Sequence, residues 1–175
     1  MYEPDPAVVR AASEGDVDSF AELVRGYQTP VYRFLRHFLG DATMAEDVAQ
    51  ETFVRAYQRL GSFRFQSKFS TWVFSIARNA GVDAVRSQGR RLRLVDRAAP
   101  PTPSVDPAAS AEVTASLAAL APRLREPLLL VEVLGLTYRE AAAVLGVPEG
   151  TVKSRVFHAR EALADWFAED VRREV

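Results

Sequence analysis

The sequence contains no cysteine and only two histidines, His37 and His158. Without cysteine there is no disulfide framework, no thiolate zinc site and no cysteine nucleophile. The two histidines lie far apart in the chain, so a histidine metal cluster is not expected, and the sequence predicts no metal or cofactor. Long apolar runs are also missing, since residues 128–131 are typical of those present. We therefore predict no insertion into a membrane.

The first five residues are acidic rather than basic and precede no apolar stretch, so no signal peptide is predicted. The chain has 175 residues, of which 48% are apolar and 26% charged. That length and composition predict one ordinary folded domain or two small ones, and they exclude a disordered tail. The expected protein is soluble and cytoplasmic.

Charge is distributed unevenly, although the net charge is only −1. Residues 1–53 carry four basic and ten acidic groups, whereas residues 54–97 carry ten basic groups against two acidic ones. A basic segment of this kind attracts phosphate, although such stretches are often only solvated surface.

A proline-rich stretch divides the chain, with four prolines between residues 98 and 107. Such a stretch cannot continue a helix and lacks the alternation of a strand. We interpret residues 96–110 as a flexible linker between two domains, residues 1–95 and residues 111–175.

Both predicted domains show helical spacing of apolar residues, and no strand is needed anywhere, so the predicted fold class is all-α. Asp16 is expected to cap one helix, and Pro30 to lie in the first turn of the next. Thr43 and Glu46 are spaced as a capping box for a third helix. A further helix is predicted over residues 70–87.

The second domain contains the pattern of a helix-turn-helix. One helix is capped by Thr137 with Glu140 and closed by Gly146, and the next buries Val152 and Val156. Helical hairpins also occur in proteins that never bind DNA. However, the second helix carries three cations and no acid between residues 151 and 160, which suits a major groove. The candidate DNA-binding residues here are Thr151, Lys153, Ser154, Arg155, His158 and Arg160.

Aromatic rings alternate with cations between residues 63 and 72, and more cations follow at helical spacing. Rings that stack on bases, beside cations that pair with phosphates, suit single-stranded nucleic acid. The alternative is that Phe63, Phe69 and Trp72 are core residues, whereas Phe65 is harder to bury. The candidate residues are Phe63, Arg64, Phe65, Lys68, Trp72, Arg78, Asn79, Asp83, Arg86, Arg90 and Arg91.

The polar face of the third helix forms an acidic stripe of Asp47, Gln50 and Glu51, with Arg55 placed to pair with Glu51. This stripe is either a solvated face or a docking surface for a basic partner, and the spacing alone leaves both open. No histidine, cysteine or nucleophile accompanies the carboxylates, so an enzyme is not expected.

Three segments together resemble the extracytoplasmic-function (ECF) sigma factors, the small initiation factors of the bacterial sigma-70 family. AEDVAQETF at residues 45–53 is similar to region 2.2 of the family. FSTWVFSIARN at residues 69–79, with the cations that follow, looks like regions 2.3 and 2.4. GTVKSRVFHAREAL at residues 150–163 looks like the recognition helix of region 4.2. The resemblance covers nearly the whole chain apart from the linker and the two ends.

The resemblance implies a sigma factor that binds core RNA polymerase, directs it to −35/−10 promoters and helps to open the DNA. Asp47, Gln50, Glu51 and Phe53 would dock on the β′ clamp helices, and the β flap is a further implied contact. The ring-and-cation residues would engage the −10 element, including a flipped base, and the duplex just upstream. The candidates on the last helix would read the −35 element.

Two other functions fit part of the sequence. A stand-alone helix-turn-helix regulator explains residues 111–165 but leaves the ring-and-cation segment without a role. A helical module that does not bind DNA would show no salt-dependent DNA affinity. The family resemblance also implies an anti-sigma partner, which no residue of this chain identifies.

Overall fold

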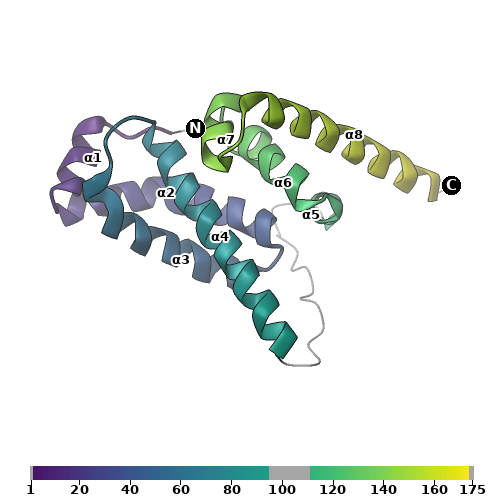
Figure 1. Ribbon diagram of the computed structural model, residues 1–175, viewed down its shortest axis with the longest axis horizontal. Coiled ribbons are helices and arrows are strands. Elements are labelled where there is room, and N and C mark those ends of the chain that lie inside the picture. The colour runs from purple at the N-terminus through teal and green to yellow at the C-terminus, as the bar shows by residue number, and fades with distance from the viewer. Residues whose placement is uncertain (1, 95–110, 174–175) are drawn as a thin grey trace.

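The computed structural model describes residues 2–94 and 111–173, in which all regular secondary structure is helical, as predicted (Figure 1). The predicted linker, residues 96–110, lies outside the described residues. The elements before it are α1 (Pro6–Ser13), α2 (Val17–Leu39), α3 (Ala42–Arg59), the 3-10 turn η1 (Leu60–Ser62) and α4 (Phe69–Leu94). The elements after it are α5 (Ala111–Ala119), α6 (Pro122–Leu128), the π-helical turn η2 (Leu129–Val133), α7 (Tyr138–Leu145) and α8 (Glu149–Arg173).

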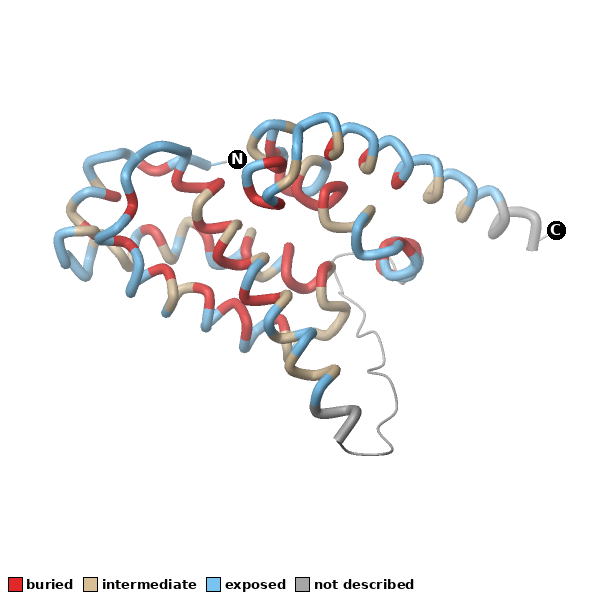
Figure 2. The backbone as a smooth tube through the Cα atoms, in the orientation of Figure 1, coloured by how far each residue is buried: buried red, intermediate tan, exposed pale blue. Residues whose placement is uncertain are grey.

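The N-terminal half buries its apolar residues between α2, α3 and α4 (Figure 2). Tyr27, Phe34 and Phe74 are fully buried there. The rings of Phe34 and Phe74 meet edge to face with centroids 5.9 Å apart, a geometry that aromatic pairs favour. This core fixes the direction of α4, which carries five of the ten cations of the basic segment.

Helix α2 runs unbroken through Pro30, so the prediction of a new helix starting at this residue is wrong. Proline inside a helix removes one backbone hydrogen bond and crowds the preceding turn. Here Tyr27 and Val31, on either side of Pro30, are completely buried against the neighbouring helices. Tertiary packing on both sides therefore outweighs the local cost.

The start of α3 also differs from the prediction. Its N-cap is Asp41, whose carboxylate accepts a hydrogen bond from the Met44 N–H at 2.9 Å. Thr43 and Glu46 consequently lie inside the helix and do not form the expected capping box. Asp41 follows Gly40, which ends α2 in the left-handed conformation (φ 73°). A direct turn from Gly40 to Asp41 leaves no room for a cap two residues later.

The C-terminal half contains the predicted helix-turn-helix. Thr137 and Glu140 form the expected capping box at the start of α7, and Gly146 ends it with φ 66°. Val152, Val156 and Ala159 of α8 are fully buried against the preceding helices. The last part of α8 extends away from the rest of the molecule (Figure 1).

The two halves pack against each other, with α4 against α7 and α2 against η2. Arg125 of α6 donates a hydrogen bond across this boundary to the carbonyl oxygen of Phe38 at 3.4 Å. The halves therefore form one continuous packed unit, and α4, which carries predicted DNA-binding residues, lies at the boundary.

Candidate nucleic-acid and polymerase interfaces

Three of the aromatic residues between 63 and 72 belong to one ring cluster at the start of α4. Phe63 and Phe69 are 8% and 4% exposed, and Trp72 is partly buried. The Trp72 ring centroid lies 5.2 Å from that of Phe63 and 5.5 Å from that of Phe69. The core interpretation of these rings therefore describes this structure, and the −10 candidate Phe63 packs inside the cluster.

Phe65 is the ring that remains available. Its side chain is 43% exposed, with a ring centroid 4.9 Å from that of Phe63. Its φ of 55° is the one positive value at a non-glycine position within residues 2–94 and 111–173. This left-handed backbone turns the side chain out of the core, and Arg10 of α1 stands 5.8 Å from its centroid.

A cavity of about 690 Å³ opens beside Phe65. One wall comes from the recognition loop, by which we mean residues 63–68. The other wall comes from the N-terminal segment, residues 2–5, and from α1. The second wall could not be predicted from the sequence, because it lies far from the recognition loop in the chain and shares no periodicity with it.

The predicted DNA-binding residues on the outward face of α4 differ in exposure and in ion pairing. Asn79, Arg86 and Arg90 are exposed. Arg91 lies within α4, but its side chain is outside the described part. The Asp83 carboxylate is already engaged, because it forms an ion pair with Arg55 of α3 at 3.0 Å.

Arg55 is therefore a bridge between helices and not an isolated member of the acidic stripe. Its guanidinium also pairs with Glu51 at 2.8 Å, as the i, i+4 spacing predicted. Hydrogen bonds to Glu51 and Asp83 raise the pKa of Arg55. Asp47 and Gln50 remain exposed on the same face, which leaves a polar surface for a partner.

Phe53 lies half-buried on a different side of α3 from Asp47. It lines a cavity of about 450 Å³ between α2 and α3, together with Val24, Tyr32 and Gln50. Gln50 thus joins this hollow to the acidic stripe. The structure brings Gln50 and Phe53 to one hollow, which has an apolar floor and a polar edge.

On α8 the predicted DNA-facing residues form a solvent-accessible face. Lys153, Ser154, His158 and Arg160 are exposed, whereas Thr151 and Arg155 are partly buried. The sequence window missed the acids that flank this face. Lys153 pairs with Glu149 at 2.8 Å, His158 pairs with Glu161 at 3.0 Å, and Arg160 pairs with Glu132 of η2. Glu149 and Glu161 were missed because they lie just outside residues 151–160, and Glu132 because it belongs to another element that the fold brings close.

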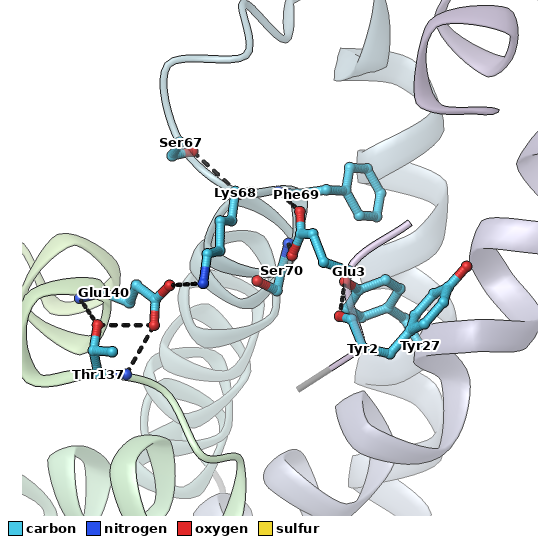
Figure 3. Close-up of polar contacts among 9 residues, drawn as sticks. All are labelled: Tyr2, Glu3, Tyr27, Ser67, Lys68, Phe69, Ser70, Thr137 and Glu140. Carbon is cyan, nitrogen blue, oxygen red and sulfur yellow. Dashed lines mark hydrogen bonds and ion pairs between the residues drawn. The ribbon is translucent and has the colours of Figure 1, made fainter. Parts of the chain in front are cut away.

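Two predicted DNA-binding cations of the first half are paired with carboxylates of the second half. Lys68 Nζ lies 2.7 Å from Glu140 Oε1, as Figure 3 shows. Arg78 Nε lies 3.0 Å from Glu126 Oε2. Arg64, by contrast, is exposed on the recognition loop. The packed arrangement therefore occupies two of the cations that the −10 element would need.

Within the described ranges, no cluster of His, Asp and Glu residues is arranged to hold a metal ion. None of the helices described is both long enough and apolar enough to cross a bilayer.

Comparison with known proteins places these surfaces in a family. Residues 23–91 match Sigma-70 region 2, and residues 110–163 match Sigma-70 region 4. The ECF RNA polymerase sigma factor SigC of Mycobacterium tuberculosis is 38% identical, over 90% of this chain and 88% of its own length. RNA polymerase sigma-H factor of Pseudomonas aeruginosa is 35% identical, over 92% of each chain. The chain belongs to the ECF sigma factors of the sigma-70 family.

Solved structures agree with this assignment. The sigma factor RpoE of Bartonella quintana, in its complex with the anti-sigma factor NepR, matches 87% of this chain with a TM-score of 0.80 and 27% identity. CnrH, in complex with the cytosolic domain of CnrY, matches 94% with a TM-score of 0.75 and 29% identity. This sigma factor therefore shares both its sequence family and its helical arrangement with them. A stand-alone helix-turn-helix regulator is not favoured, because residues 23–91 also match a sigma region.

Proposed function

We propose that this sigma factor binds core RNA polymerase through the acidic stripe of α3 and reads promoters with two separate surfaces. The recognition loop and α4 engage the −10 element, and α8 engages the −35 element. The observation that carries the proposal is the exposed Phe65 ring beside a cavity, because an unpaired base needs both a ring to stack on and space to occupy.

The division of labour follows the two halves of the chain. Residues 1–95 serve as the polymerase-binding and −10-reading domain, and residues 111–175 serve as the −35-reading domain, with residues 96–110 between them in the sequence. The factor acts in the cytoplasm by recruitment and DNA opening and performs no covalent chemistry. On the polymerase it contacts the β′ clamp helices and the β flap.

The docking surface is tested by gel filtration of the protein mixed with bacterial core RNA polymerase. Asp47→Arg with Glu51→Arg reverses two exposed charges of α3, so co-elution with core should be lost. The matched control is Glu14→Arg with Asp165→Arg, which makes the same charge change at exposed positions outside α3. The control should co-elute as the wild type does. If the α3 variant keeps its co-elution while remaining folded, the acidic stripe is not the docking face.

Promoter reading is tested with the holoenzyme and a pool of random duplex DNA. Wild-type holoenzyme should enrich sequences with two conserved blocks, and the selected DNA then serves as the promoter for the experiments below. No enrichment over core polymerase alone would contradict the proposed function.

We further propose an anti-sigma protein as a regulatory partner. The support is that two structurally similar proteins, RpoE and CnrH, were solved in complexes, with the anti-sigma factor NepR and with the cytosolic domain of CnrY. The same gel-filtration assay tests this partner. A protein that co-purifies with the sigma factor from its host should displace core polymerase in proportion to its concentration.

A further inference from the structure

The N-terminal segment lies beside the start of α4, where Glu3 points to the first residues of that helix (Figure 3). Glu3 Oε1 accepts a hydrogen bond from the Phe69 N–H at 2.5 Å, and Oε2 accepts one from the Ser70 N–H at 3.3 Å. These are the first two residues of α4, whose N–H groups have no partner within the helix. Glu3 therefore caps α4 from a position 66 residues earlier in the chain.

The segment that carries Glu3 is itself fixed. The Tyr27 hydroxyl donates a hydrogen bond to the Tyr2 carbonyl oxygen at 2.7 Å, and the two rings lie 5.8 Å apart. Burial, together with the Glu3 carboxylate, raises the pKa of Tyr27, so its hydroxyl stays protonated as a donor. Gly26 makes room for the contact, because a Cβ there would lie 2.8 Å from the Tyr2 ring.

The cap acts directly next to the recognition loop. The loop ends at Lys68, and the capped amide of Phe69 follows immediately. Glu3 and Pro4 also line the cavity beside Phe65, and Arg10 stands over the Phe65 ring. One short stretch of chain thus fixes both the end of the loop and the opposite wall of its cavity.

We propose that Glu3 is a positioning residue for −10 recognition. By fixing the first turn of α4, its carboxylate holds the recognition loop in place as one wall of the cavity, so that an unpaired base can enter beside Phe65. This inference rests on the proposed function, because it assigns the cavity to a promoter base. Glu3 acts through the loop and is not expected to bind core polymerase.

The carboxylate geometry makes the role specific. Two oxygens accept from two adjacent amides, and the negative charge lies at the positive end of the α4 dipole. Glutamine keeps the length but offers one acceptor and no charge, and alanine offers neither. Loss of an N-cap typically changes a local opening equilibrium by roughly fivefold. We therefore expect a graded series in which Glu3→Gln is intermediate and Glu3→Ala is weakest.

The experiment uses the full-length factor in two measurements. Hydrogen exchange of the free protein follows the amides of residues 63–72. Permanganate footprinting of the holoenzyme on the selected promoter follows open-complex formation, with core affinity measured alongside. Glu14→Ala is the control, because Glu14 is an exposed acid nearby at the end of α1. Tyr27→Phe is a second variant that loosens the segment without touching Glu3.

In Glu3→Ala we expect exchange at Phe69 and Ser70 to accelerate by roughly fivefold, and open-complex yield to fall by a similar factor at unchanged core affinity. Tyr27→Phe should move both readouts in the same direction by less. Wild-type exchange and opening in Glu3→Ala would overturn the proposal, and so would equal losses in Glu14→Ala. If Glu3→Ala fails to fold, Glu3→Gln decides the same two readouts.

The two levels of inference remain separable. A wild-type holoenzyme that opens no promoter contradicts the proposed function, whatever the variants do. Normal wild-type opening with no response to Glu3 or Tyr27 contradicts the positioning role alone.

Discussion

Phe65 combines an unfavourable backbone with an exposed ring. The left-handed region costs most non-glycine residues roughly 1–2 kcal/mol, and Phe65 adopts it at φ 55°. Burial of the ring offsets only part of this cost, because the ring is 43% exposed. Residues held in such conformations tend to occur at functional sites. The exposed ring is consistent with a residue kept for contact with a partner.

The Phe65 ring can be tested by removing its π face at nearly constant size. Phe65→Leu should lower the open-complex equilibrium of the holoenzyme by about 5- to 100-fold, since a stacked base contributes roughly 1–3 kcal/mol. Phe65→Tyr, which keeps the ring, should behave like the wild type. Permanganate footprinting on the selected promoter measures the loss. Equal opening by the Leu and Tyr variants would exclude stacking.

Single residues also show which features a sequence pattern can predict and which it cannot. The alternation of rings and cations drew attention to the recognition loop, and the expectation that Phe65 is harder to bury than Phe63 is confirmed. The left-handed backbone at Phe65, which exposes the ring, could not be predicted from that alternation. Glu3 had no local signal at all, because its partners at residues 69 and 70 lie across the fold.

At the scale of elements, α4 contains two glycines in contrasting surroundings. A Cβ on Gly81 would lie 2.7 Å from the Phe38 ring of α2 and 3.3 Å from Leu35. A Cβ on Gly89 would meet nothing within 4 Å. The first glycine therefore permits close approach of α2 and α4, and the second only weakens the helix.

This contrast predicts opposite effects of one substitution. Gly81→Ala should lower the free energy of unfolding by about 1–3 kcal/mol, because the stacked Phe34 and Phe38 rings leave little room for an added methyl group. Gly89→Ala should raise it by about 0.5–1 kcal/mol through helix propensity. Urea denaturation of both variants measures the difference. Stabilisation by both would show that α2 yields freely at this contact.

Most helices could be predicted, because their caps and apolar stripes are local signals. Asp16, Gly146 and the Thr137–Glu140 box act as expected. The unbroken α2 could not be predicted, since the outcome at Pro30 depends on burial against other helices. The π-helical turn η2 could not be predicted either, because one extra residue in a turn leaves no mark on the apolar periodicity. Helix α1 was not predicted.

At the scale of the whole molecule, ion pairs join the two halves, and their cations are ones that the proposed function assigns to DNA binding. Glu140 caps α7 and pairs with Lys68 of the recognition loop. Burial by itself would raise the pKa of Glu140, but the bonds from Lys68 and Thr137 prevail and lower it below its usual value of 4.5. On the proposed function, promoter DNA would have to compete with this internal contact for Lys68.

The contact predicts opening of the two halves when Lys68 loses its charge. Lys68→Met leaves the Thr137–Glu140 box intact but removes the ion pair, so the halves should separate more often. Because the chain has no cysteine, Asp18→Cys and Ala164→Cys give clean sites for two dyes and energy-transfer measurements. The matched control is Lys153→Met, whose partner Glu149 lies on its own helix.

Acid should have the same effect as Lys68→Met. The folded-state pKa of Glu140 is depressed, so the ionised carboxylate stabilises the packed arrangement fully at pH above the unfolded-state pKa. This stabilisation is lost as the pH falls below about 4.5. The Lys68→Met protein should respond less to this acidification. Identical energy transfer in wild type, Lys68→Met and Lys153→Met would show that the ion pair does not hold the halves together.

The acids beside α8 have a further consequence for searching a genome. Glu149 and Glu132 act as counterions of Lys153 and Arg160 on the face that would enter the major groove. A phosphate that contacts either cation must first displace its carboxylate, so fewer net charges are neutralised and affinity should depend on salt less steeply than the cation count implies. Phosphate contacts with random duplex would not be strong enough to outweigh the ion pairs with these carboxylates. The free factor should therefore spend little time on non-promoter DNA and remain available to polymerase.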